Sequence, residues 1–346
     1  GATTVTGGTS QVAALAHGGV NSSIGPRSSA GANLVLAGGT LRYAGSTAQS
    51  TDRLFTLGGP AGLSATLDAS GSGTGTVSFT NGGALAYGGS GARTLTLTGS
   101  NTGANTLAPT LADGAGGATS LVKNGAGTWS LTGANPHSGG TSVTNGTLLV
   151  NNTTGSGTGS GAVTVAGGAT LGGAGAINAS NAAVTIQGIL DVGNAGDIAG
   201  EDFVFNLTGS STFALSGEVK LDLFANSGTG SLNAGTATDL LSVTAPAIDL
   251  SGATLTWSNV NALNNWAIGD TWKLFSWSTA AFTGNFANIT GASGNFAGLP
   301  DLSGVNLAWD ASHLYTAGTL VVIPEPGRAV LLLAGLLGLA LRRRRP

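Results

Sequence analysis

The stretch LVKNGAGTWSLTGANPHSGGTSVTNGTLLVNNTTGSGTGSGAVTVAGGATLGGAGAI, from Leu121 to Ile177, contains the pattern that decides the fold. Its apolar residues alternate with Thr, Ser and Asn over short runs, which is the period of a β-strand with one buried face. Pairs of glycines separate the runs, and glycine adopts the positive-φ corners that such turns need. We therefore expect short strands that bury Val, Leu, Ile and Ala on one side only.

A related pattern recurs on both sides of this stretch, as a glycine-rich turn, a small or polar residue and then a leucine. The separations of these leucines range from 17 residues to 26 residues. This spacing is typical of one turn of a β-solenoid, in which stacked coils share one core. A β-sandwich, which also has closely spaced short strands, is the alternative fold. The anchoring leucines are Leu41, Leu67, Leu85, Leu107, Leu131, Leu148, Leu171 and Leu190.

Residues 121–177 resemble the autotransporter-associated β-strand repeat, whose pattern is K-x-G-x-G-T-[WL]-x-L-[ST]-G-x-N-x-[YF]-[ST]-G-G-T-x-V-x-x-G-T-L. His137 stands where that family has an aromatic residue, and Pro136 precedes it. The resemblance implies an all-β, right-handed parallel β-helix of exported, surface-associated proteins, and it implies no catalytic activity. The matching residues are Lys123, Gly125, Gly127, Thr128, Trp129, Leu131, Gly133, Asn135, Gly139, Gly140, Thr141, Val143, Gly146, Thr147 and Leu148.

Composition divides the chain into three ranges. We expect residues 1–202 to form the solenoid and residues 203–321 to form an aromatic-rich β cap, because five of the six tryptophans fall between Trp257 and Trp309. Bulky aromatic side chains would fill the open face of the last coil. A surface that stacks against sugars is the alternative role for these aromatics. Residues 322–346 form the third range.

The third range is VIPEPGRAVLLLAGLLGLALRRRRP, and it orders Pro324, Glu325 and Pro326 before an apolar run at 329–341. These 13 residues would span roughly 20 Å as a helix, which is shorter than a hydrocarbon core of about 30 Å. Flanking arginines can compensate for such a mismatch, and a cluster of arginines favours the cytoplasmic side. We therefore expect a short hydrophobic membrane helix, retained by Arg342, Arg343, Arg344 and Arg345.

Pro-Glu-Pro, an apolar helix and an arginine cluster, in that order, resemble the PEP-CTERM sorting signal. The resemblance implies transient recognition by an exosortase, a membrane protease of Gram-negative bacteria that cuts near Pro-Glu-Pro. The precursor would be tethered to the inner membrane, and the mature protein would be at the cell surface or extracellular. A plain tail anchor with a proline linker is the alternative.

The residues offer little for catalysis. The chain has no cysteine, so it can form neither a disulfide nor a thiolate metal site. His17, His137 and His313 are far apart in sequence and lack the spacing of metal ligands. No Walker A or GxSxG motif occurs. Charged residues are 8% of the chain and the net charge is −3, which argues against a nucleic-acid partner. We therefore expect no enzyme activity, no catalytic residue and no cofactor.

One acidic stretch, DVGNAGDIAGED, offers weak candidates for calcium ligands, because carboxylate oxygens suit that ion. A solvated loop is the alternative role for this stretch. The four candidate residues are Asp191, Asp197, Glu201 and Asp202.

These observations predict an exported structural or adhesin-like protein of the cell surface or extracellular matrix. Rows of Thr, Ser and Asn on a stiff solenoid suit many weak contacts with exopolysaccharide or neighbouring proteins, and such contacts add up to avidity. The alternative is a polysaccharide-binding or polysaccharide-degrading β-helix, and the degrading form needs two carboxylates about 5–10 Å apart. An autotransporter passenger is a further alternative, and it would need a C-terminal membrane barrel.

Overall fold

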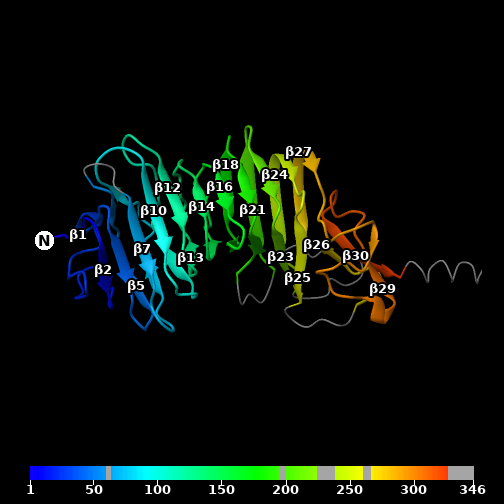
Figure 1. Ribbon diagram of the computed structural model, residues 1–346, viewed down its shortest axis with the longest axis horizontal. Coiled ribbons are helices and arrows are strands. Elements are labelled where there is room, and N and C mark those ends of the chain that lie inside the picture. The colour runs from blue at the N-terminus through cyan, green and yellow to red at the C-terminus, as the bar shows by residue number, and fades with distance from the viewer. Residues whose placement is uncertain (60–63, 195–199, 224–237, 260–265, 326–346) are drawn as a thin grey trace, which may run out of the picture.

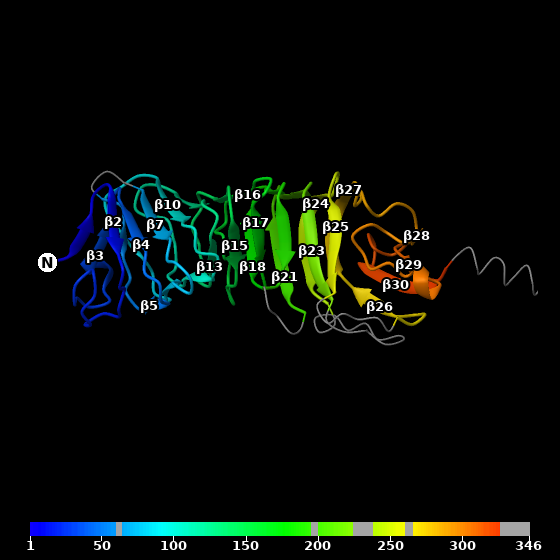
Figure 2. The same ribbon diagram turned by 60° about the horizontal axis from the view of Figure 1, so that its bottom comes forward.

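The computed structural model describes residues 1–59, 64–194, 200–223, 238–259 and 266–325. In these ranges the chain is an elongated all-β rod whose strands lie across the long axis, one coil after another (Figures 1 and 2). The helical elements described are two short 3-10 turns, η1 (Gly31–Asn33) and η2 (Ser303–Val305). The all-β prediction is confirmed, whereas the helix expected at 329–341 lies outside the described residues. No helix in the described ranges combines the length and the apolar character that a membrane crossing requires.

Two long sheets run the length of the rod. The first contains, in chain order, β2 (Thr9–Val12), β4 (Thr40–Tyr43), β7 (Ala65–Ala69), β10 (Arg93–Thr98), β12 (Thr119–Lys123), β14 (Thr141–Val143), β16 (Val163–Val165), β18 (Ala176–Ser180), β19 (Val184–Ile186), β21 (Asp202–Thr208), β22 (Thr212–Leu215), β24 (Leu240–Asp249) and β27 (Phe275–Thr283). The second contains β5 (Gln49–Thr51), β8 (Val77–Phe79), β11 (Asn105–Leu107), β13 (Thr128–Leu131), β15 (Thr147–Val150), β17 (Thr170–Gly173), β20 (Ile189–Val192), β23 (Glu218–Leu223) and β25 (Thr254–Asn259).

Two small sheets complete the structure. The first coils have a third side made of β1 (Thr3–Val5), β3 (Leu34–Leu36), β6 (Thr56–Leu57) and β9 (Ala86–Tyr87). The far end of the rod carries an antiparallel sheet of β26 (Thr271–Lys273), β28 (Ser293–Gly294), β29 (Leu307–Asp310) and β30 (Thr319–Pro324).

Strand pairing identifies the solenoid. Strands in the two long sheets pair in parallel, with Leu41 opposite Leu67 and Leu148 opposite Leu171. Two neighbouring parallel strands need a crossover connection between them. In this rod, the segment that connects two neighbouring strands of one sheet includes a strand of another sheet. Aliphatic side chains therefore stack in ladders inside the rod, which excludes the antiparallel sandwich and matches the parallel β-helix that the repeats predict.

The eight anchoring leucines are all buried, but they do not form one ladder. Leu41 and Leu67 lie in the first long sheet, whereas Leu107 and the later members lie in the second. Leu85 lies outside any strand, just before β9. The spacing in the sequence thus gives the length of a coil, and the side of the coil on which a leucine falls depends on corner lengths that the pattern does not encode.

The predicted boundary at residue 202 does not mark a change in strand pairing. Parallel ladders continue through β24 and β27 to Thr283. The coils here are longer than those of the repeat, with 29 residues between the paired Val184 and Phe213 against 22 between the paired Thr141 and Val163. A longer coil encloses more volume, and Phe203, Phe205 and Phe213 fill it with ring centroids 4.9 and 5.1 Å apart. The aromatic side chains that begin at 203 therefore first fill coils of the parallel solenoid. Only the later ones belong to the antiparallel end.

Tryptophans fill the antiparallel end of the rod. Trp257, Trp266, Trp272 and Trp309 pack together with ring centroids 5.5–5.9 Å apart. The indoles of Trp272 and Trp309 are fully buried. These two rings therefore contribute to a core and have no open face on which a sugar could stack.

Candidate functional site

The polar residues that identify the repeat are mostly buried and hold the coils together. Lys123 is fully buried, and its Nζ donates hydrogen bonds to the carbonyl oxygens of Asn124 at 3.3 Å, Gly125 at 2.8 Å and Asn145 at 2.9 Å. Burial lowers the pKa of Lys123 to about 8. The lysine of the motif therefore clamps two successive coils at one corner, since Asn124 and Asn145 belong to neighbouring turns of the solenoid.

Asn135 plays a similar part at another corner. Its Oδ1 accepts a hydrogen bond from the Leu111 N–H at 2.8 Å, and its Nδ2 donates to the Gly157 carbonyl at 2.6 Å. The side chain is buried, so it satisfies backbone groups of the coils before and after its own. This asparagine therefore has a structural role between coils.

His137 occupies the aromatic position of the repeat as a buried ring. Its Nε2 lies 3.3 Å from Thr141 Oγ1, and its Nδ1 has no hydrogen-bond partner among the described residues. Burial lowers the pKa of His137. A neutral imidazole thus replaces the usual aromatic side chain, and a ring is still present in the core after Pro136.

Two neighbouring grooves lie in the middle of the rod, and β18 contributes a residue to each of them. One groove, of about 490 Å³, is lined by Thr110, Ala134, Asn135, Pro136, Gly155, Ser156, Gly159, Ser160 and Asn178. The other, of about 550 Å³, is lined by Asn151, Asn152, Thr153, Ala174, Gly175, Ala176, Asn194, Glu201, Asp202 and Val204. We call this second groove the amide–acid groove.

Side-chain amides and carboxylates line the amide–acid groove. Asn151 Nδ2 donates to Asn194 Oδ1 at 2.7 Å, and Asn194 Nδ2 donates to Glu201 Oε2 at 2.7 Å. Asp202 lies next to this series of hydrogen bonds, and burial raises the pKa of its carboxyl. Such a row of donors and acceptors suits hydroxyl groups, which both donate and accept hydrogen bonds.

The three calcium candidates that the structure describes do not form one site. Asp191 lies opposite Lys220 in the second long sheet, whereas Glu201 and Asp202 line the amide–acid groove. Burial raises the pKa of Asp191, and the Lys220 ammonium opposes that shift. Asp197 lies outside the described residues. Over the described ranges, no three His, Asp or Glu side chains are placed to hold a metal ion.

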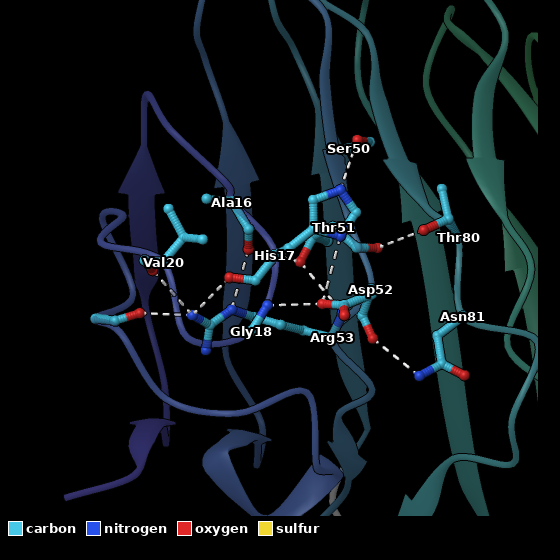
Figure 3. A network of polar contacts seen from close by, with 11 residues as sticks. Ala16, His17, Gly18, Val20, Ser50, Thr51, Asp52, Arg53, Thr80 and Asn81 are labelled. Carbon is cyan, nitrogen blue, oxygen red and sulfur yellow. Dashed lines mark hydrogen bonds and ion pairs between the residues drawn. The ribbon is translucent and has the colours of Figure 1, made fainter.

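A hydroxyl, an imidazole and a carboxylate meet on the first coils (Figure 3). Ser50 Oγ lies 3.3 Å from His17 Nε2, and His17 Nδ1 lies 3.5 Å from Asp52 Oδ1. This is the order of a nucleophile and its base in serine hydrolases, where the carboxylate is buried. Here Ser50 is exposed, and His17 and Asp52 keep 52% and 42% of their side-chain surface exposed. Separations of 33 and 35 residues hid this trio from sequence reasoning.

The same network holds a loop against the rod. The Asp52 carboxylate accepts a hydrogen bond from the Gly18 N–H at 2.7 Å. The buried Arg53 guanidinium donates to the carbonyls of Ala16 at 3.1 Å and Gly25 at 2.7 Å (Figure 3). Ser50, His17 and Asp52 therefore belong to a polar network that holds the connection between β2 and β3 against the rod.

The tail motif is described only at its first two residues. Pro324 is exposed and ends β30, and the Glu325 N–H donates to the Asn306 carbonyl at 3.1 Å. Pro326 and the arginines at 342–345 lie outside the described residues. The Pro-Glu-Pro sequence thus begins at the surface, where the last strand of the antiparallel sheet ends.

Comparison with known proteins supports the repeat. Residues 121–150 match the profile of the family described as "Passenger-associated-transport-repeat". The chain is also 48% identical over 134 residues to the adhesin BmaC autotransporter of Brucella suis biovar 1 (strain 1330). That alignment covers 38% of this chain and 4% of the adhesin. No solved structure matches the chain. The repeat predicted over residues 121–177 is therefore confirmed for residues 121–150, which are similar to the passenger-associated transport repeat.

Proposed function

We propose that the chain is an exported, non-enzymatic, adhesin-like component of the cell surface or extracellular matrix. The similarity of 134 residues to a protein named as an adhesin is the observation that carries this proposal. The parallel rod supports it, because a solenoid displays the same face over many coils and multiplies weak contacts.

The amide–acid groove is the contact site that we favour on this rod. Its amides and the carboxylates of Glu201 and Asp202 suit the hydroxyl groups of a polysaccharide. Removing the two negative charges with Glu201→Gln and Asp202→Asn should weaken binding of purified protein to extracellular polysaccharide about tenfold, if both contacts are to sugar hydroxyls. The matched control is Asp301→Asn with Asp310→Asn, which changes two acidic residues near the antiparallel end.

Biolayer interferometry on immobilised polysaccharide would measure this binding. Equal binding by both double variants would contradict the groove as the contact site. Release of new reducing ends from the polysaccharide would instead support the alternative of a degrading enzyme that uses Glu201 and Asp202 as its carboxylate pair.

We further propose that residues 322–346 are a PEP-CTERM sorting signal read by an exosortase. The order of Pro324, Glu325, Pro326, the apolar run and the arginines supports this proposal. The exposure of Pro324 after the last strand also supports it, since a protease needs an accessible extended segment.

Coexpression with and without an exosortase tests this signal. Mass spectrometry of the mature C-terminus should show cleavage beside Pro324 only when the enzyme is present. An intact arginine end in secreted material from cells that contain the exosortase would contradict the sorting signal, while leaving the adhesive role of the rod untouched.

A further inference from the structure

Three Asn-Gly dipeptides occur in the chain, at Asn81, Asn124 and Asn145. Two of them, Asn124-Gly125 and Asn145-Gly146, lie one coil apart at the same corner of the rod, where the Lys123 ammonium contacts both. Both asparagines are exposed to solvent. The following glycines have φ values of 81° and 66°, which a residue with a Cβ rarely adopts.

The side chains at these two corners point at the next backbone nitrogen. The Gly125 N–H donates to Asn124 Oδ1 at 2.6 Å, and the Gly146 N–H donates to Asn145 Oδ1 at 2.8 Å. The carboxamide carbon is bonded to that oxygen, so it also lies close to the glycine nitrogen. Reacting atoms held about 3–3.5 Å apart are in a near-attack arrangement, which lowers the entropic part of a barrier.

Lys123 adds an electrostatic effect at both corners. Its Nζ contacts the backbone carbonyl oxygens of Asn124 and Asn145, and these oxygens belong to the same peptide groups as the two glycine nitrogens. A cation at a carbonyl oxygen withdraws electrons from the peptide group, and therefore makes its N–H more acidic and its carbonyl carbon more electrophilic. The lysine thus favours loss of the proton that must leave before the nitrogen can attack.

We propose that Asn124 and Asn145 are self-modification sites that lose ammonia and become acidic, with Lys123 as the positioning residue. The glycine nitrogen gives its proton to hydroxide and attacks the asparagine Cγ, so that an N–Cγ bond forms. The Cγ–Nδ2 bond then breaks, and the departing nitrogen takes a proton from water and leaves as ammonia. Water opens the resulting five-membered imide. One water is consumed and one ammonia is released for each site.

The position of Lys123 also predicts which product forms. Opening the imide at the side-chain carbonyl gives aspartate, whereas opening at the backbone carbonyl gives isoaspartate. The lysine polarises the backbone carbonyl, so isoaspartate is the main product at both sites. Its new carboxylate then forms beside the Lys123 ammonium, and each conversion adds one negative charge to this corner of the rod.

Asn81 serves as an internal control. Its Oδ1 accepts a hydrogen bond from the Gly83 N–H at 2.9 Å. Its Nδ2 donates to the Asp52 carbonyl at 2.9 Å (Figure 3). The carboxamide is therefore held at both ends and is not bound to the Gly82 nitrogen. The same dipeptide is thus present in a conformation that disfavours the reaction.

The experiment incubates the full-length chain in heavy-oxygen water, once folded and once unfolded in urea. Peptide mapping by mass spectrometry then measures heavy-oxygen uptake at each of the three asparagines. The ratio of the folded rate to the unfolded rate cancels the intrinsic reactivity of each sequence. We expect this ratio to be about tenfold or more higher at Asn124 and Asn145 than at Asn81. Ratios at Asn124 and Asn145 no higher than that at Asn81 would overturn the proposal.

A variant isolates the role of the lysine. Lys123→Met should reduce both the rate and the isoaspartate fraction at the two sites, with Asn81 unchanged, and circular dichroism would check that the variant is folded. An unchanged isoaspartate fraction in a folded variant would overturn the assignment of Lys123. If this variant fails to fold, the comparison with Asn81 in the unaltered chain still decides whether the two corners react.

Discussion

At the scale of single residues, the repeat motif predicts where a residue lies in a coil better than it predicts what the side chain does there. The leucines of the repeat lie in the core, as their alternation predicts. Lys123 and His137 are also fully buried, although lysine and histidine are rarely core residues. Their burial could not be predicted from the sequence, because it depends on hydrogen bonds to carbonyl and hydroxyl groups of other parts of the solenoid.

Lys123 predicts a pH dependence of stability on the alkaline side. The folded pKa is about 8 and the ordinary value is 10.5, so between these values the unfolded chain binds more protons than the folded chain. The unfolding free energy should therefore rise as the pH increases through this window. At about 1.4 kcal/mol for each pKa unit, the window from about 8 to 10.5 corresponds to a rise of roughly 3 kcal/mol.

Denaturant unfolding at a series of alkaline pH values would measure this rise. Lys123→Met should remove it, whereas Lys273→Met, in the antiparallel end, serves as the control that should retain it. An unfolding free energy that falls over the window in the unaltered chain would contradict a buried, depressed lysine.

His137 predicts the opposite sensitivity, on the acidic side. Burial lowers its pKa below the ordinary 6.5, so the unfolded chain takes up a proton that the folded chain resists. Stability is complete above 6.5 and falls as the pH drops below that value. His137→Phe, which restores the aromatic residue of the family, should remove this contribution. The exposed His313→Phe provides the comparison, and equal acid sensitivity of both variants would count against the prediction.

At the scale of elements, alternation predicts strands and paired glycines predict corners. The side of the coil on which each strand falls was not predictable, because corner loops differ in length. The amide–acid groove combines residues of several coils, since its lining includes Asn151, Ala174 and Asp202. Glu201 and Asp202 were identified as a calcium candidate from local density of acids, and only the coil geometry places them beside Asn151 and Asn194.

Asn135 gives a prediction about contacts between coils. Asn135→Ala leaves the Leu111 N–H and the Gly157 carbonyl without this partner in a buried region, which costs about 1–3 kcal/mol for each unsatisfied group. We expect the midpoint of denaturant unfolding to fall by the corresponding amount. The exposed Asn206→Ala should change it by less than about 0.5 kcal/mol. Similar midpoints for the two variants would show that the loops have other support.

At the scale of the whole molecule, the recurring pattern predicts a rod and the structure describes one. Composition changes at 203, while the parallel pairing continues to Thr283. Local sequence patterns indicate which side chains fill a coil. The position at which the solenoid ends depends on the antiparallel pairing of β26 with β30, which are distant in sequence.

The rod shape predicts the size of the molecule in solution. A compact domain of 346 residues has a radius of gyration of roughly 20 Å. The elongated solenoid should exceed this value clearly in small-angle X-ray scattering, with a distance distribution that has a long tail. A radius of gyration near the compact value would mean that the coils do not stack into one extended body.

The direction of the hydrogen bonds in this solenoid has a mechanical consequence. Bonds between successive coils run along the rod, and the N-terminus and β30 lie toward opposite ends of it (Figure 1). Tension between these ends therefore peels the terminal coil away while the remaining coils stay closed. Each released coil of about 20 residues adds up to roughly 70 Å of chain. A solenoid of this kind therefore lengthens in steps under load, because each coil can open while its neighbours stay stacked.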